Sequence, residues 1–268
     1  IEQLKHYGFS DYKILTSLQQ HNNNHLETSL DLLNIKKEDQ LIKKMVKADY
    51  QLEPRSFAGG TFGKVYNAKV IGDGEKDWAV KISKDTEDDI EIIINEMGYY
   101  YLFSKHGIGP KLPYRNAFYI SDRDHLFAIV TEKYTSDLDI LLGKIHQSYH
   151  QKTLDSIEIT NCLRDIETRI HPLINKMLDL GVICIDLKPK NMLVNYHDNL
   201  EIKDLVLTDF GIDWCCNTKV KPVCDYIDKP NYLEQSNYRY YISLMLYLCI
   251  CVESLYRNIK LFPDKIKE

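Results

Sequence analysis

The sequence lacks the features that define several broad protein classes. Its seven cysteines are an odd number at irregular spacing with no CxxC pair, so neither a disulfide framework nor a zinc ribbon is expected. The formal net charge of −5 gives no global basic field, which argues against a nucleic-acid partner. The longest apolar run, residues 241–255, is shorter than the roughly 18–20 residues that cross a bilayer. We expect that run to form a buried core helix, and we expect no membrane span.

The composition is that of an ordinary globular protein, with 44% hydrophobic and 27% charged residues. We therefore expect reduced thiols and a cytoplasmic location, in the host cytoplasm if the source is a virus or an intracellular microbe. The one cysteine cluster that warrants a test for metal is Cys215, Cys216 and Cys224. No signal peptide is visible, and because the chain starts at Ile1 rather than Met, we expect the natural N-terminus to lie upstream.

Regions of different hydrophobic periodicity follow one another along the chain. Residues 1–36 are polar with helical spacing, and the charged stretch 37–49 is interpreted as a linker. Residues 50–134 alternate like strands around one helix, whereas helical patterns dominate residues 135–268. Strands followed by helices predict an α+β domain with a β-rich lobe and a helical lobe, preceded by a small helical segment.

A glycine-rich turn opens the strand-like region. It contains Ala58, Gly59, Gly60 and Gly63 and runs into a β-branched and aromatic stretch from Val65. Glycines allow backbone N–H groups to approach phosphates closely. No Lys-Ser/Thr pair follows the last glycine, so the turn is not a Walker A loop. A plain hairpin remains the alternative for this turn taken alone.

A lysine in the next strand and a carboxylate in the following helix form a candidate pair. Lys81 is the one charge in the run WAVKI. In the helix that follows, a 100° step per residue places Glu96 in the apolar stripe of residues 93, 97 and 100, and Glu91 on the opposite face. An inward carboxylate is costly unless it meets a cation, so Lys81 is its expected partner.

The segment Asp186-Leu187-Lys188-Pro189-Lys190-Asn191 and the later Asp209-Phe210-Gly211 carry the strongest signal. They resemble the catalytic loop and the D-F-G element of eukaryotic-type Ser/Thr protein kinases. The resemblance implies that Asp186 is the catalytic base and that Lys188 neutralises the transferred phosphoryl group. It also implies that Asn191 and Asp209 bind Mg²⁺ against the phosphates of ATP.

The same resemblance extends to the nucleotide site. The turn is similar to the kinase Gly-rich loop with Ala58 at the first glycine, and Lys81–Glu96 corresponds to the family's phosphate-orienting ion pair. Thr131 would be the gatekeeper before a hinge. The cofactor-binding residues that the resemblance implies are Ala58, Gly59, Gly60, Gly63, Val65, Ala79, Lys81, Glu96, Thr131, Glu132 and Tyr134.

The sequence departs from the family at several positions. Cys184 and Ile185 stand where His and Arg usually precede the catalytic Asp, so no activation-loop switch of the usual type is expected. No A-P-E triplet follows Gly211, and 57 residues remain after it, which predicts a minimal helical lobe. A catalytically inactive scaffold and a small-molecule kinase are the alternatives to a protein kinase.

The first 36 residues resemble a ubiquitin-associated domain. Apolar spacing predicts short helices with turns near Gly8 and near residues 22–24. The resemblance implies that ubiquitin binds an exposed patch of Gly8, Phe9, Leu32 and Leu33. The alternative is a brace that packs these residues on the β-rich lobe.

Overall fold

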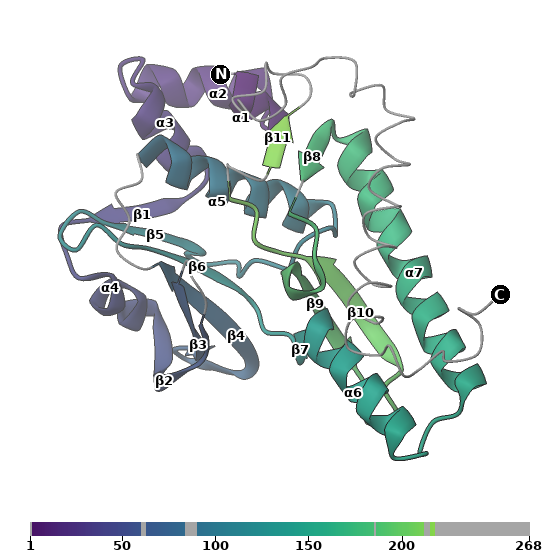
Figure 1. The fold of residues 1–268 in the computed structure, drawn as a ribbon. Helices are drawn as coiled ribbons and strands as arrows, with labels where there is room; N and C mark the ends of the chain where they lie inside the picture. The colour runs from purple at the N-terminus through teal and green to yellow at the C-terminus, as the bar shows by residue number, and fades with distance from the viewer. Residues whose placement is uncertain (1, 60–62, 84–89, 185, 212–214, 218–268) are drawn as a thin grey trace. The chain divides into compact units, whose positions relative to one another are not determined.

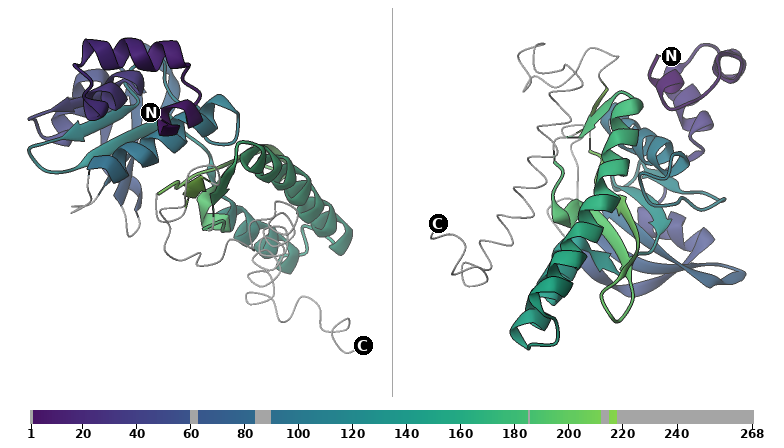
Figure 2. Two further views of the ribbon diagram at one scale, coloured as in Figure 1. Left: turned by 90° about the horizontal axis from the view of Figure 1, so that it is seen from above. Right: turned by 90° about the vertical axis from the view of Figure 1, so that its right-hand side faces the viewer.

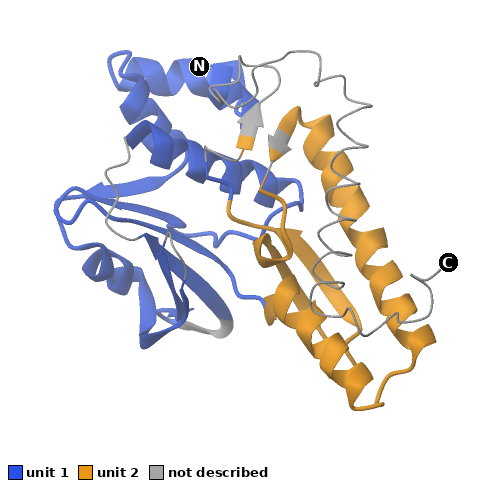
Figure 3. Cartoon of the chain, viewed as in Figure 1, with its two compact units in different colours: residues 1–134, 210–212 blue, residues 135–209, 213–268 orange. Residues whose placement is uncertain are grey.

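The structure, a computed structural model, describes residues 2–59, 63–83, 90–184, 186–211 and 215–217. Gly60, Ile185, Cys224 and the apolar run 241–255 therefore lie outside the described residues. The chain divides into two compact units, Ile1–Tyr134 with Phe210–Ile212 and Thr135–Asp209 with Asp213–Glu268 (Figure 3). In the part of the chain that is described, no helix has the length and apolar character needed to cross a membrane.

The first unit begins with three short helices, α1 (Glu2–His6), α2 (Asp11–Gln20) and α3 (His25–Leu32). The asparagine run between the last two explains their boundary. Asn22 and Asn23 adopt positive φ angles of 51° and 63°, which asparagine tolerates better than most residues. The Asn24 side chain then caps α3 by accepting from the backbone N–H groups of Leu26 and Glu27.

A six-stranded sheet forms the centre of this unit, in the order β1-β5-β6-β4-β3-β2 (Figure 1). Its strands are β1 (Ile35–Glu38), β2 (Tyr50–Gly59), β3 (Gly63–Val70), β4 (Asp73–Ser83), β5 (Phe118–Ser121) and β6 (Phe127–Glu132). The edge strand β1 pairs in parallel with β5, whereas the other pairs are antiparallel. Because β1 directly follows α3, it ties the N-terminal helices to the sheet.

The expected linker over residues 37–49 instead contains the end of β1 and the helix α4 (Ile42–Asp49). Its apolar residues Ile42, Met45 and Val46 are at most 2% exposed and join the core on one face of the sheet. Spacing of i, i+3 and i+4 places them on one side of the helix, and its lysines are exposed, with Lys43 Nζ 4.9 Å from the centroid of the Tyr66 ring at the rim of this core. Burial of these apolar side chains stabilises a helix in a segment whose charged composition alone had suggested a linker.

The helix α5 (Ile90–Lys105) is buried around most of its circumference. Ile93, Met97 and Tyr100 form one buried stripe, and Tyr99 and Leu102 are also at most 2% exposed. In both Figures 1 and 2, α5 lies between the N-terminal helices and the sheet. Its exposed residues, Glu91 and Lys105, lie near its two ends, as expected for a helix whose middle is largely apolar.

Within its described residues, the second unit contains two long helices, α6 (Leu138–His150) and α7 (Ser156–Asp179), and two small sheets. One sheet has the order β10-β9-β7, from Ile202–Leu207, Met192–Tyr196 and Ser136–Asp137. The other pairs β11 (Cys215–Asn217) with β8 (Val182–Cys184). A 3₁₀ turn, η1 (Pro189–Asn191), leads into β9.

Candidate active site

The register of the large sheet brings four predicted nucleotide-site residues to one face. On β4, Trp78, Val80 and Ile82 are buried in the core with α4, so the alternate residues Ala79 and Lys81 point to the opposite face. Directly paired residues on neighbouring strands share a face. The pairs Val65↔Lys81 and Ala79↔Thr131 therefore place Val65 and Thr131 on the same side as Lys81.

Lys81 and Glu96 form a partly buried ion pair on that face. The Lys81 Nζ lies 3.2 Å from the Glu96 Oε1, with side chains 20% and 12% exposed. Glu91, by contrast, is exposed. The helical periodicity that favoured Glu96 over Glu91 as the partner thus agrees with the geometry. A fixed ammonium group on a sheet face suits a phosphate ligand.

The strands β2 and β3 bring the two ends of the glycine-rich turn together. Ala58 pairs with Val65 and Gly59 pairs with Lys64, so the strands on either side of residues 60–62 are adjacent in the sheet. Gly63 cannot carry a side chain, because a Cβ atom there would lie 2.5 Å from the backbone oxygen of Ile82. Gly63 is therefore required by the close approach of β3 and β4 as well as by any phosphate contact.

The segment after β6 contains the predicted hinge. Thr131 is 9% exposed and Tyr134 is 7% exposed, so both side chains lie inside the unit. The backbone N–H of Glu132 donates to the carbonyl oxygen of Lys111 at 2.8 Å. This bond anchors the start of the hinge to the loop before β5.

In the second unit, hydrogen bonds organise the predicted catalytic loop around Asp186. The Oδ2 of Asp186 accepts from Lys188 Nζ at 2.7 Å and from Asn191 Nδ2 at 2.9 Å. Asn191 Nδ2 also donates to the backbone oxygen of Asp186 at 3.0 Å. Leu187 and Pro189 are buried and hold the loop against the unit. Lys188 and Asn191 both donate to Oδ2 of Asp186, and neither donates to Oδ1.

The antiparallel pair β9–β10 brings Asn191 and Asp209 to the same end of two adjacent strands. Met192 pairs with Leu207, and the Thr208 N–H donates to the Asn191 backbone oxygen at 2.9 Å. Asp209 follows with a φ of +66°, an uncommon conformation for a residue other than glycine. Such backbone strain persists where the surrounding structure enforces it, often at functional sites.

The donor chemistry of these two residues fits Mg²⁺. Magnesium prefers oxygen ligands and commonly takes one or two protein groups, with phosphates and water completing its shell. Asn191 Nδ2 is engaged with Asp186, which leaves the amide oxygen for a cation, and Asp209 supplies a carboxylate. No group of three or more His, Cys, Asp or Glu side chains suited to a metal occurs among the described residues. The cysteine cluster falls partly outside them, because Cys224 and the side chain of Cys216 are not described.

Phe210, which belongs to the first unit, packs on α5. Its ring is fully buried and meets Tyr100 and Phe103 edge to face, with centroids 4.9 and 4.6 Å apart. Gly109 leaves room for it, since a Cβ there would lie 3.1 Å from the Phe210 ring. The residue after Asp209 is thereby anchored to the helix that carries Glu96.

The apolar patch expected for ubiquitin is not exposed. Phe9 is 8% exposed and stacks on Tyr101 of α5, with centroids 5.0 Å apart, and Leu33 is 3% exposed. Leu32 is half-buried, and Gly8 alone is exposed. Phe9 and Leu33 pack inside the unit, because the side of α5 that faces the N-terminal helices is itself apolar. The prediction of an exposed patch at Gly8, Phe9, Leu32 and Leu33 is therefore wrong for Phe9 and Leu33.

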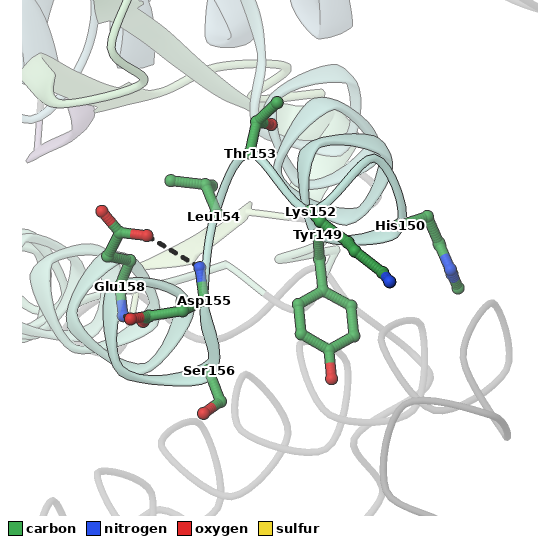
Figure 4. A pocket seen from close by; sticks show the side chains of 8 residues that line it. All are labelled: Tyr149, His150, Lys152, Thr153, Leu154, Asp155, Ser156 and Glu158. Atoms are coloured by element: carbon green, nitrogen blue, oxygen red, sulfur yellow. Dashed lines mark hydrogen bonds between the residues drawn. The ribbon is translucent and has the colours of Figure 1, made fainter.

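A separate hollow of about 540 Å³ lies between the end of α6 and the start of α7 (Figure 4). Tyr149, His150, Lys152 and Asp155 are among the residues that line it, and it contains none of the predicted site residues. Asp155 and Glu158 cap α7 reciprocally, with the Asp155 N–H donating to Glu158 Oε2 at 2.7 Å. Its two carboxylates, Asp155 and Glu158, are thus engaged in helix capping.

Sequence comparisons find no match, whereas structure comparisons find proteins of similar fold. No protein family matches the sequence, and no curated protein matches it. The BubR1 kinase domain superposes with a TM-score of 0.51 at 15% identity, covering 80% of this chain and 63% of that one. A Rad53 fragment, 1–466, in complex with AMP-PNP gives 0.45 at 21% identity, covering 62% and 39%. The chain thus spans less than two thirds of the length of either protein. The likeness to the BubR1 kinase domain shows that this chain has a two-lobed α+β fold of the protein-kinase type.

Proposed function

We propose that this protein is an ATP- and Mg²⁺-dependent phosphotransferase that acts on serine or threonine hydroxyls of protein substrates. Residues 50–134 would form its β-rich lobe and residues 135–268 its helical lobe. The observation that carries the proposal is the hydrogen-bonded loop in which Asp186 Oδ2 is held by Lys188 and Asn191. The protein-kinase-type fold and the buried Lys81–Glu96 pair support it.

Each residue has a chemical role in this proposal. Lys81, oriented by Glu96, would bind the α- and β-phosphates, and the backbone around Gly59 and Gly63 would cover them. Asn191 and Asp209 would hold Mg²⁺, which neutralises charge on the phosphates when it is bound.

The loop residues would handle the acceptor. With Oδ2 engaged by its neighbours, the Oδ1 of Asp186 would orient the acceptor hydroxyl and accept its proton. Lys188 would stabilise charge on the phosphoryl group as the bond to ADP breaks.

Ubiquitin recruitment is not part of the proposal. Burial of Phe9 and Leu33 in the first unit supports the alternative, a segment that packs on its own lobe. The N-terminal helices would then act as a brace that packs on the β-rich lobe, which a titration with labelled ubiquitin tests.

The proposal is tested with the variant Asp186→Asn. We expect Mg²⁺-ATP affinity to change less than about threefold while phosphoryl transfer to a protein substrate panel falls by about 10²-fold or more, because binding is kept and the proton acceptor is lost. Nucleotide binding is measured by thermal shift and transfer by radiolabelled ATP. A parent protein that binds Mg²⁺-ATP but transfers nothing to proteins or small molecules would indicate an inactive scaffold. Transfer to small molecules alone would indicate a small-molecule kinase.

A further inference from the structure

The N-terminal segment runs along the outer side of α5, the helix that carries Glu96. Tyr7 contacts Asn95 and Tyr99, Phe9 stacks on Tyr101, and Lys105 Nζ lies 3.5 Å from the backbone oxygen of Gly8. From Asn95 to Lys105 these contacts span nearly three turns of the helix. The segment therefore covers most of the length of α5.

Tyr7 is the most deeply buried side chain of this contact, at 1% exposed. Its hydroxyl donates to Asn95 Oδ1 at 2.8 Å and accepts from Gln3 Nε2 at 2.9 Å. The same hydroxyl lies 3.4 Å from the backbone oxygen of Asn95. These part-buried hydrogen bonds hold the Tyr7 hydroxyl against Asn95.

Gly98 provides the space that the Tyr7 ring occupies. A Cβ atom at position 98 would lie 2.2 Å from both Cε2 and Cζ of Tyr7, far inside van der Waals contact. Glycine in the interior of a helix is unfavourable relative to alanine, so its presence at the centre of α5 calls for a packing reason. The close fit of the Tyr7 ring is that reason.

The contact determines the rotation of α5 about its axis. Asn95, held by Tyr7, directly precedes Glu96, whose carboxylate reaches Lys81 at 3.2 Å. Successive residues of a helix are 100° apart, so a helix that is fixed at Asn95 has its Glu96 direction fixed as well. Gly98 lies three residues after Asn95, on the same face of α5, and restricts rotation of the helix, because any side chain there would meet the Tyr7 ring.

We propose that Tyr7 is a positioning residue of the nucleotide site: seated on Gly98 and bonded to Asn95, it holds α5 in the rotation that pairs Glu96 with Lys81. This inference rests on the proposed function and assigns part of the site assembly to the N-terminal segment. The nucleotide site is then completed in cis by residues that lie about 75–90 positions upstream of the elements they orient.

The first test compares Tyr7→Phe with Tyr50→Phe. Tyr50 is equally buried, and its hydroxyl also donates one hydrogen bond, at 2.9 Å to the Asn116 backbone oxygen, but it does not contact α5. Hydrogen exchange of the α5 amides is measured without nucleotide, and Mg²⁺-ATP affinity is measured on the same proteins. We expect Tyr7→Phe to lower α5 protection and to weaken Mg²⁺-ATP binding by about two- to tenfold, and Tyr50→Phe to do neither.

The second test uses Gly98→Ala and a double-mutant cycle with Glu96→Gln. Alanine favours the helix, so a purely structural role predicts unchanged or tighter Mg²⁺-ATP binding, whereas displacement of Tyr7 predicts weaker binding. If Gly98 acts through Glu96, Gly98→Ala has no further effect on affinity in the Glu96→Gln background.

The outcomes separate the two claims. Unchanged α5 protection in Tyr7→Phe, or additive losses in the cycle, would overturn the inference. A parent protein that binds no nucleotide would overturn the proposed function, while a specific loss of α5 protection would still support Tyr7 as the residue that fixes α5.

Discussion

Asp49 shows how a single carboxylate connects three elements. As the last residue of α4 it meets the negative end of the helix dipole, which disfavours its charge. It accepts from the Tyr119 hydroxyl at 2.9 Å and from Asn116 Nδ2 at 3.1 Å, and Lys36 Nζ lies 3.6 Å away. Burial raises the pKa of Asp49, but these donors outweigh it and leave the pKa below its usual value.

The lowered pKa predicts a pH-dependent contribution to stability. Asp49→Asn should reduce the free energy of unfolding at pH 7 by about 1–2 kcal/mol, because two donors lose a charged acceptor. A carboxylate whose pKa is lower in the folded state stabilises the fold above its unfolded pKa of about 4, and this contribution is lost as the pH falls through the folded value. Urea denaturation between pH 7 and pH 3 should therefore show the two curves converging at the acid end.

Asp137 provides a control of opposite sign. Burial raises the pKa of this side chain, which caps α6 by accepting from the Ile140 N–H. Its folded state therefore favours protonation, so its contribution is greatest below the unfolded pKa and is lost as the pH rises. Asp137→Asn keeps a good cap and should gain in relative stability toward neutral pH. A constant offset between parent and Asp49→Asn at all pH values would contradict the role given to Asp49.

At the same scale, the predictability of the site depends on the sequence separation of its contacts. Lys81 and Glu96 are 15 residues apart, and helical periodicity alone selected Glu96. Tyr7 and Asn95 are 88 residues apart, and no local pattern relates them. The one available signal was a glycine in the middle of a largely apolar helix, which indicates a close neighbour but does not name it.

At the scale of elements, the fold was predictable where hydrophobic periodicity is long and regular. The three N-terminal helices, the central strands and α5 follow from their apolar spacing and their turn residues. The strand β1 and the helix α4 were missed, because a parallel edge pairing with β5 is non-local and because lysines obscured the short stripe of Ile42, Met45 and Val46. Such short elements become ordered by burial rather than by their own propensity.

The two faces of α5 predict different effects of two similar substitutions. Glu96→Gln removes the charge that faces Lys81 and should weaken Mg²⁺-ATP binding by about tenfold, because the lysine loses its orienting partner. Glu91→Gln alters an exposed carboxylate on the same helix and should leave the affinity within about twofold. Titration with a fluorescent ATP analogue in the presence of Mg²⁺ compares them directly. Equal effects of the two variants would contradict the assignment of Glu96 to the site.

At the scale of the whole molecule, the sequence was sufficient to predict a two-lobed kinase-type α+β fold, and the likeness to the BubR1 kinase domain confirms it. The motifs responsible, residues 186–191 and 209–211, are short loops whose chemistry constrains residue types strongly. The placement of the N-terminal segment could not be predicted in the same way, because an apolar surface on a small helical segment can serve a partner or its own chain equally well. The residues of α5 that pack against the segment distinguish binding of a partner protein from packing on the chain's own lobe.

Removal of the N-terminal helices tests whether this segment packs on its own chain. The segment buries Leu4, Tyr7, Phe9, Leu18, Leu30 and Leu33. Deleting residues 2–34 while keeping β1 exposes the facing side of α5, so the free energy of unfolding should fall by several kcal/mol, as for the loss of more than one large buried side chain. Thermal denaturation of the deletion variant, compared with the full chain, measures this loss.

A ubiquitin titration completes the test. Because Phe9 is stacked on Tyr101 and Leu33 is buried, the full chain offers ubiquitin little of the apolar surface that a recruiting patch needs. Labelled ubiquitin should therefore show no chemical-shift changes on addition of the full chain up to about 1 mM, well beyond the affinity of a specific interface. Shift changes together with an unaltered stability of the deletion variant would reverse the assignment, since the segment would then be dispensable for the fold and available to a partner. Unaltered stability of the deletion variant, together with no shift changes on addition of the full chain, would contradict both roles and would remove Tyr7 from the assembly of the nucleotide site.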